Sequence, residues 1–325
     1  MEQAVKQSVR QPKKGFDIGK FSQYGIYFAF IIMCILFAVF NPVFLTLGNI
    51  MNIVRQISFN AILAMGMTMV IITGGIDLSV GSVLAIAAVV SASFIKAASP
   101  ILPMPVALLI GLLIGAVCGL FNGIFVTKGK LPPFIVTMVS MTIARGAAQL
   151  FTKGRPVSGL VPEFTYLGAG FLLGIPVPIY ILLVVVIISY FILNNTRLGR
   201  YIYAVGGNEM AAEASGIKVH RIKLFAYIYS GILAALVGMI LTARLNSASP
   251  VVGSGYELDA IAASVIGGTS MEGGRGKVIG VLVGALIIGT ISNGLDILNV
   301  SSYWQQIVKG LIILVAVLID RKGAR

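Results

Sequence analysis

The sequence predicts an all-α protein that crosses a membrane many times as a polytopic transmembrane helical bundle. Of its 325 residues, 58% are hydrophobic and only 11% are charged, and the mean hydropathy is +0.98. A soluble domain cannot bury that much apolar surface, because a large apolar excess would remain exposed to water. The apolar runs are continuous and of helical length, whereas the strands of a membrane barrel would alternate in segments of about ten residues.

Apolar segments separated by polar loops give about ten candidate spans. The segment 258–269 is too short to cross about 30 Å of hydrocarbon as a helix, so it is tilted, re-entrant or longer than its apolar part. A count of about eight or nine remains an alternative. The candidate spans are 21–40, 57–73, 80–95, 105–126, 132–151, 176–193, 223–242, 258–269, 277–294 and 303–320.

The basic residues are distributed unequally between the two sides of this threading. With the N-terminus inside, 17 of the 24 Lys and Arg residues fall in inner segments, five in outer loops and two within spans. Cytoplasmic loops carry such an excess of positive charge, so both termini are expected in the cytoplasm. Residues 1–20 are then a cytoplasmic tail and 21–325 one transmembrane domain. The loops account for the net charge of +13, and nucleic acid is not an expected partner.

Two apolar segments carry glycines at every fourth position, which places them on one helix face. Such a face lets another backbone approach closely, within the chain, at a subunit interface or along a pathway. The first set is Gly111, Gly115, Gly119 and Gly123, and the second is Gly276, Gly280 and Gly284.

The residue patterns that catalysis requires are missing from the sequence. No G-x-x-x-x-G-K-[ST] phosphate loop occurs, and one His with two separated Cys does not give the ligand spacing of a zinc site. We expect no catalytic residue, no metal site and no cofactor bound by this chain, which should not hydrolyse ATP itself.

The loop 194–223 is far more polar than its surroundings and carries the only histidine. Asn208 is a suitable N-cap, Glu209 lies in the first turn, where acids are favourable, and Gly216 fits the left-handed position after a helix. These signals predict a helix of barely two turns, which is marginal alone in water. A docking element for a cytoplasmic protein is favoured over a helix lying on lipid, which would carry bulky apolar residues and lysines.

Several motifs, in order along the chain, resemble the permeases of ATP-binding-cassette importers, in particular the monosaccharide permeases of the ribose, galactose and xylose group. The loop "NEMAAEASGIKV" is similar to the family's cytoplasmic coupling loop, with Ala211, Ala212 and Gly216 at the family's spacing. The glutamate usual before the alanines is replaced by Met210, and Glu209 lies one position earlier. The resemblance covers nearly all of 21–320, through "GMTMVIITGGIDLSVGS" (66–82), "NTRLGRYIYAVGGNEMAAEASGI" (195–217), "GYELDAIAASVIGGTSMEGGRGKVIG" (255–280) and "VSSYWQQIVKGLIILVAVLID" (300–320).

This resemblance implies a permease of a bacterial cell membrane that imports a monosaccharide, with ribose as the expected sugar. A cytoplasmic ATPase would hold ATP and Mg²⁺, and an extracytoplasmic sugar-binding protein would deliver the substrate. A second permease subunit would complete the pathway as a homodimer, surrounded by membrane lipid. The residues expected to couple to the ATPase are Asn208, Glu209, Met210, Ala211, Ala212, Glu213 and Gly216.

Polar residues within or beside the spans are the candidates for a pathway or gate. Asp77 follows a pair of glycines at the end of a span, where an ionisable group is either functional or a cap that holds the loop against the next helix. Neutral amides suit an uncharged sugar, although each also serves helix packing. The candidates are Asp77, Asn60, Asn122, Asn293 and the glycine break at Gly267 and Gly268.

Two further expectations concern the outer side and a rival function. Outer charged segments that a binding protein would contact contain Glu257, Asp259, Arg244, Arg55, Lys153 and Arg155. The rival is an ion-coupled secondary transporter of a small polar solute, which would require paired acids deep within the spans.

Overall fold

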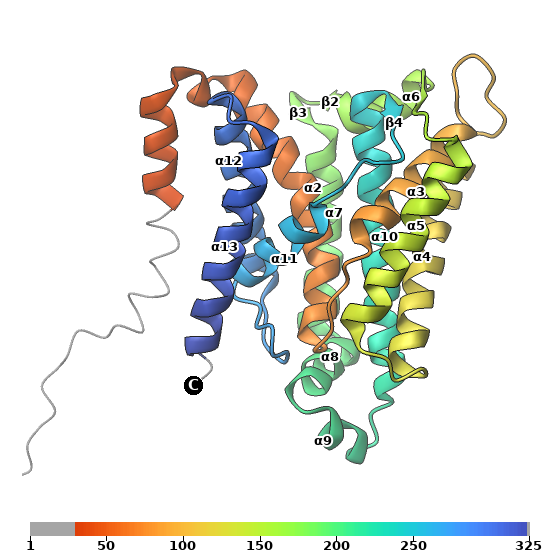
Figure 1. Cartoon of the computed structure of the whole chain (residues 1–325), viewed down its shortest axis with the longest axis vertical. Coiled ribbons are helices and arrows are strands. Elements are labelled where there is room, and N and C mark those ends of the chain that lie inside the picture. Colours follow the sequence, from red (N-terminus) through yellow and green to blue (C-terminus); the bar gives the residue numbers. More distant parts are fainter. Residues whose placement is uncertain (1–29, 324–325) are drawn as a thin grey trace, which may run out of the picture.

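The computed structural model describes residues 30–323, with side chains through residue 318. Helices stand side by side in one bundle, with short elements at both ends (Figure 1). The predicted tail 1–20 and the beginning of the predicted span 21–40 lie outside the described residues. After helix Phe30–Phe40, the elements are η1 (Pro42–Leu45), α2 (Leu47–Ile72), α3 (Val80–Ser93), α4 (Met104–Thr127), α5 (Pro133–Thr152), β1 (Val157–Ser158), α6 (Pro162–Ala169), β2 (Phe171–Leu172), β3 (Ile175–Pro176), α7 (Val177–Asn195), α8 (Arg197–Gly207), α9 (Glu209–Ala214), α10 (Val219–Leu245), β4 (Ser247–Ala248), α11 (Tyr256–Ile266), α12 (Val278–Ile297) and α13 (Ser302–Gly323).

Within the described part of the chain, six helices are long and apolar enough to cross a membrane: α2, α4, α5, α7, α10 and α12. Shorter apolar helices accompany them at Phe30–Phe40, at α3 and in the Ser302–Leu318 part of α13. The predicted class, a polytopic helical membrane protein, is confirmed. Five predicted spans match α4, α5, α7, α10 and α12 closely.

Two predicted spans are half-helices, so the count of about ten complete spans is not confirmed. α3 has 14 residues and α11 has 11. At 1.5 Å per residue they rise only about 21 Å and about 17 Å, against about 30 Å of hydrocarbon. The predicted segment 80–95 does form a helix, Val80–Ser93, but a complete span there is not confirmed, whereas the short length of 258–269 is confirmed. A largely non-helical segment precedes each half-helix, 73–79 before α3 and 246–255 before α11.

α2 begins at Leu47, well before the predicted start at 57. Thr46 caps the helix, because its Oγ1 accepts a hydrogen bond from the amide of Asn49. The sequence placed this polar turn in a loop. Asn49 is instead buried, and its amide exchanges hydrogen bonds with Asn293 of α12 in both directions, at 3.0 and 2.9 Å. A polar residue is tolerated in the helix because its partner satisfies it.

The two halves of the bundle repeat the same order in opposite directions. The first half, α2–α5, consists of a long helix, a largely non-helical segment, a half-helix and two further helices. The same series occurs again as α10–α13. Each long helix packs on the half-helix of the other half: α10 on α3 and α4, and α2 on α11 and α12. The half-helices therefore lie in the interior, between the long helices.

The first glycine set is a packing face within the chain. A Cβ on Gly115 would overlap the carbonyl oxygen of Gly231, and a Cβ on Gly119 would overlap that of Tyr227, both on α10. In the second set, α12 begins at Val278, so Gly276 lies before the helix and the predicted helical spacing fails there. Gly280 and Gly284 do belong to the helix.

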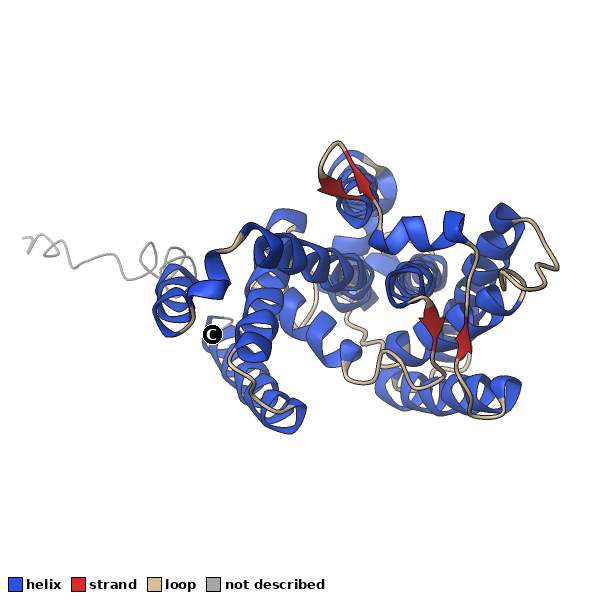
Figure 2. Cartoon of the chain, turned by 90° about the horizontal axis from the view of Figure 1, so that it is seen from above, coloured by secondary structure: helices blue, strands red, loops and turns tan. Residues whose placement is uncertain are grey.

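The end of the bundle opposite α8 and α9 carries short elements that the sequence did not predict. β1 pairs with β4, and β2 pairs with β3, each antiparallel over two residues. The view from above shows the β2–β3 hairpin above a helix at the periphery and the β1–β4 pair over another side of the bundle (Figure 2).

Candidate functional site

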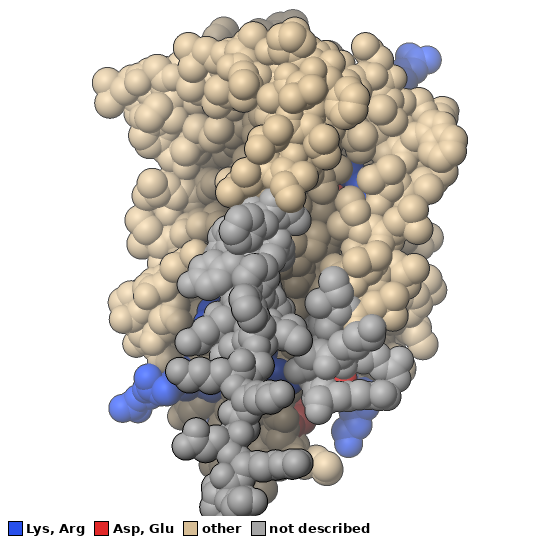
Figure 3. All heavy atoms as spheres, turned by 90° about the vertical axis from the view of Figure 1, so that its left-hand side faces the viewer, with Lys and Arg blue, Asp and Glu red and all other residues tan. Residues whose placement is uncertain are grey.

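One end of the bundle collects the basic loops and the predicted coupling loop. α8, α9, the turn 128–132 and the loop 267–277 all lie at this end, which we call the basic end (Figure 1). In the face shown in Figure 3, most of the visible charged side chains lie toward the same end, and one basic side chain lies at the opposite end. This distribution of charged residues agrees with the unequal count of Lys and Arg in the sequence, because the loops that the sequence assigned to one side of the membrane lie at one end of the bundle.

The predicted helix between Asn208 and Gly216 forms as α9. The Asn208 side chain accepts a hydrogen bond from the Ala211 amide at 2.9 Å, and Gly216 adopts a left-handed φ of +81°. Lys223 on α10 donates to Glu209 at 2.6 Å, which ties the start of α9 to the bundle. The cap and terminator predicted from sequence are both confirmed.

α9 presents one face to the bundle and another to solvent. Ala212 is 4% exposed and packs into the hydrophobic core, whereas Met210 is 81% exposed. Ala211, Glu213 and Ala214 are exposed with Met210. These four side chains form the exposed face of α9, and Ala212 supports them from behind.

α8 connects α9 to the ends of two other elements. Its face toward the bundle buries Ile202 and Val205. The Tyr203 hydroxyl donates to the carbonyl of Gly276 at 2.9 Å, and burial raises the pKa of Tyr203. The amide of Gly274 donates to the carbonyl of Ile72, the last residue of α2, at 2.9 Å. The loop before α12 and the end of α2 thus meet beside α8.

The glycine break at Gly267 and Gly268 begins this loop. Gly268 has a φ of +86°, and a Cβ on Gly267 would lie 2.5 Å from the carbonyl oxygen of Gly280. Both positions therefore require glycine, one for its backbone conformation and one for close contact. The structure places them at the junction of α11 and α12, near the basic end.

Asp77 is buried at the break between α2 and α3, with 1% of its surface exposed. Its Oδ1 accepts from the amide of Ser79 at 3.0 Å and from the Ser79 hydroxyl at 2.6 Å. Its Oδ2 accepts from Ser230 of α10 at 2.8 Å, and Asn122 of α4 donates to the Ser79 hydroxyl at 2.9 Å. Asp77 and Asn122, two of the candidates, thus belong to one hydrogen-bonded cluster that holds the break against α4 and α10.

The other amide candidates occupy helix contacts. Asn293 is engaged with Asn49, and this pair joins α12 to α2. Asn60 is 3% exposed within α2. The structure brings neither residue into the Asp77 cluster.

Arg145 on α5 holds the second break, a role that was not predicted from the sequence. Its guanidinium donates to the carbonyls of Pro250 and Val252 at 3.0 and 2.8 Å, and to that of Gly81 at 3.1 Å. One cation therefore binds both the segment before α11 and the first turn of α3. A lone arginine inside an apolar span was the signal to follow, because such a charge requires a partner.

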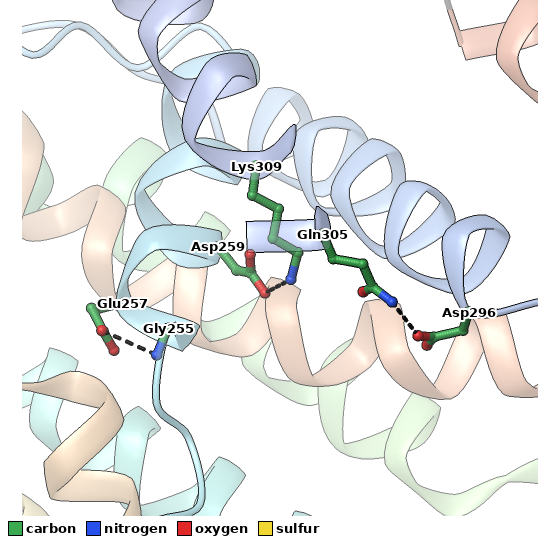
Figure 4. A network of polar contacts seen from close by, with 6 residues as sticks. All are labelled: Gly255, Glu257, Asp259, Asp296, Gln305 and Lys309. Atoms are coloured by element: carbon green, nitrogen blue, oxygen red, sulfur yellow. Dashed lines mark hydrogen bonds and ion pairs between the residues drawn. The ribbon is translucent and has the colours of Figure 1, made fainter. Parts of the chain in front are cut away.

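Asp259 does not belong to the outer charged surface where the sequence placed it. It is 4% exposed, and Lys309 on α13 donates to its Oδ2 at 2.8 Å. The neighbouring Gln305 donates to Asp296, and Glu257 accepts from the amide of Gly255 (Figure 4). The prediction failed because the Asp259 side chain faces Lys309 of α13 and not solvent, a contact between segments 50 residues apart in the sequence. An acid and a lysine in two apolar segments were the missed signal.

Two arginines at the opposite end rest on aromatic rings. The Arg55 guanidinium carbon lies 4.5 Å from the ring centre of Phe171, and that of Arg244 lies 5.7 Å from the ring centre of Phe59. Stacking of this kind holds a guanidinium in place over the face of an aromatic ring.

The comparisons with known proteins define the class. A family model described as "Branched-chain amino acid transport system / permease component" matches residues 49–317. This match covers most of the chain, and the chain belongs to this family of transport permeases. Together with its apolar helices, membership makes it a multi-pass protein of the bacterial cell membrane and a transport subunit.

Among its relatives, the chain is 49% identical to the ribose import permease of Haemophilus influenzae, over 96% of this chain and 97% of the relative. It is 48% identical to the ribose import permease of Bacillus subtilis, over 96% of each chain. The D-allose transport system permease of Escherichia coli is 41% identical over 95% of both chains. No solved structure matches the chain.

Proposed function

We propose that this chain is the membrane-spanning permease of an ATP-driven importer of ribose. The observation that carries the proposal is identity to ribose import permeases of 48–49% over nearly the whole length. Identity is lower to the permease named for D-allose, at 41%, and to that named for L-arabinose, at 39%. Ribose is therefore the sugar that the comparisons favour.

The basic end faces the cytoplasm in this proposal, with both termini on that side, and the ATPase docks on α9. Supporting this, the exposed face of α9 is small and carries an acid, while its buried face is fixed by Ala212 and by the ion pair of Glu209 with Lys223. A short helix that is held firmly against the bundle can pass a displacement of its exposed face on to the bundle. ATP and Mg²⁺ belong to the partner, because the sequence has no phosphate loop.

The opposite end receives the sugar-binding protein, and a second copy of this chain completes the pathway. Arg55 and Arg244 are held by Phe171 and Phe59 at that end and suit acidic groups on a delivered protein. Outward-facing apolar side chains on α4, α5 and α7 meet lipid or the second copy.

Reconstitution tests the function directly. Vesicles containing the permease and its ATPase, supplied with a ribose-loaded binding protein outside and ATP inside, should accumulate ribose. Accumulation driven by an ion gradient without the ATPase would overturn the proposal in favour of a secondary transporter. Equal uptake of ribose, allose and arabinose, each delivered by its own binding protein, would overturn the assignment of the sugar.

Docking on α9 is tested by bulk on its exposed face. Ala211→Trp should abolish co-purification of the ATPase, because a contact shaped for a methyl group would be overfilled at a cost of about 1–3 kcal/mol or more. Ala211→Ser is the matched control, since it changes polarity with little change in size. Ala212 is a poor test, because bulk there would disturb the core behind the helix. Full ATPase binding by Ala211→Trp would contradict docking on this face.

A further inference from the structure

The helix that carries the docking face, α9, directly follows α8, which packs one face against the bundle. Asn208 ends α8 and caps α9, and its amide donates to the carbonyl of Ala204 at 3.1 Å. The two helices are therefore joined through this single residue. A displacement of α9 moves the last turn of α8 with it.

That last turn contacts other backbone with no side chain in between. A Cβ on Gly206 would overlap the carbonyl oxygen of Ile72 and lie 2.5 Å from the amide nitrogen of Gly274. Gly274 in turn donates to Ile72 at 2.9 Å. A Cβ on Gly273, which has a φ of +89°, would lie 2.8 Å from the carbonyl oxygen of Gly206. Three chain segments thus meet main chain to main chain.

A second contact lies one turn earlier on the same side of α8. Tyr203, three residues before Gly206, donates its hydroxyl to the carbonyl of Gly276. Residues three apart share a helix face. α8 therefore holds the segment 273–276 at two points.

The contacted groups adjoin the two half-helices of the bundle. Ile72 ends α2, and the segment 73–79 with Asp77 and α3 follows it. The loop 267–277 links the half-helix α11 to α12. One turn of α8 thus touches the end of α2, which leads into half-helix α3, and the loop that leaves half-helix α11.

We propose that Gly206 is a positioning residue for coupling: its bare backbone transmits displacement of α9 to the end of α2 and to the loop before α12. This inference rests on the proposed function. Contact between backbones leaves no rotamer to absorb the displacement, as a flexible side chain would. In this role Gly206 acts through its contacts with the backbones of Ile72, Gly273 and Gly274.

The adjacent glycine supplies a matched control. A Cβ added to Gly207 would meet nothing within 4 Å, and this glycine is exposed. It borders an open hollow of about 270 Å³ lined by Gly206, Gly207, Glu272, Gly273, Gly274 and Arg275. Both glycines are in α8, and replacing either by alanine improves helix propensity similarly. Only Gly206→Ala separates the three backbones.

The experiment compares Gly206→Ala with Gly207→Ala in vesicles that contain the ATPase and receive ribose-loaded binding protein. Gly206→Ala should still co-purify with the ATPase and keep basal ATP hydrolysis, while ribose uptake per ATP falls about tenfold. Gly207→Ala should keep the wild-type ratio of ribose to ATP. Failure of the wild-type permease to import ribose would sink the proposed function itself, and it is seen separately in the same assay.

If Gly206→Ala yields too little folded protein, Tyr203→Phe provides a second test of the same contact. It removes only the hydrogen bond to Gly276 and should lower ribose uptake per ATP by about twofold to fivefold with ATPase binding intact. A wild-type ratio in both variants would overturn the inference. Loss of ATPase binding by Gly206→Ala would also overturn it, because the residue would then serve docking and not transmission.

Discussion

The segment before α3 and the segment before α11 interrupt the bundle in equivalent places, yet opposite chemistry holds them. In the first, the carboxylate of Asp77 accepts hydrogen bonds from Ser79 and from Ser230 of α10. In the second, the guanidinium of Arg145 donates to the carbonyls of Pro250 and Val252. One break gathers donors around an acceptor, and the other gathers acceptors around a donor.

The difference follows from which groups each break leaves unpaired. Where non-helical backbone lies at membrane depth, its polar groups need protein partners, because lipid offers none. The turn before α3 presents an amide and hydroxyls, which an acid satisfies. The segment before α11 presents carbonyls, which only a donor satisfies. Arg145 also donates a hydrogen bond to the carbonyl of Gly81 in the first turn of α3, so this one guanidinium stabilises the surroundings of both breaks.

Removing the acceptor should have the largest effect. Asp77→Ala leaves the Ser79 and Ser230 donors buried without a partner and should lower the free energy of unfolding by about 3–5 kcal/mol, since each bond to a charged group contributes about 1.5–3. Thermal unfolding in detergent would measure the loss. Asp77→Asn retains one acceptor oxygen and should lose about half as much. Equal melting temperatures for the two variants would show that the carboxylate does not organise the break.

Removing the donor should have an intermediate effect. Arg145→Met frees three carbonyls and should cost about 2–4 kcal/mol, and Arg145→Lys should restore only part of this, because an ammonium lacks the planar fork. Loosening of 246–255 should also speed labelling of a cysteine at exposed Ser254, in a background with Cys34 and Cys118 replaced by serine. Wild-type labelling rates in Arg145→Met would contradict a role in holding this segment.

Removing one donor from the Asp77 cluster should have the smallest effect. Ser230→Ala deletes a single hydrogen bond to the carboxylate and should cost about 1–2 kcal/mol. In the double variant with Asp77→Ala, the two losses should not add, because both remove the same contact. Additive losses in melting experiments would show that Ser230 stabilises the protein by another route.

Sequence patterns predicted the class and the coupling helix well, because those features depend on local signals. Apolar length identifies spanning helices, and Asn208 and Gly216 mark the ends of α9 through their own backbone preferences. The amphipathic face of α9 was less accessible. Only the fold shows that Ala212 turns inward, because that depends on α10 and the core behind it.

Contacts between distant segments could not be predicted in the same way. Asn49 meets Asn293, and Asp259 meets Lys309, across intervals that no local pattern spans. The prediction of a full span at 80–95 failed because the helix covers only Val80–Ser93, and the segment 73–79 before it is kept non-helical by a side-chain cluster that includes Asn122 of α4 and Ser230 of α10. Hydropathy indicates whether a segment lies in an apolar environment or in water, and it does not show which backbone conformation the segment adopts.

The glycine face of α4 has a consequence for how this gene can vary. Any replacement of a glycine adds at least a methyl group, and at Gly115 and Gly119 even a methyl group would overlap the backbone of α10. The outward face of the same helix, with Leu109, Leu113 and Val117, accepts any comparable apolar residue. Neutral drift in α4 is therefore easier on the outward side of the helix, and the codons of Gly115 and Gly119 are restricted to synonymous change by the distance between two main chains.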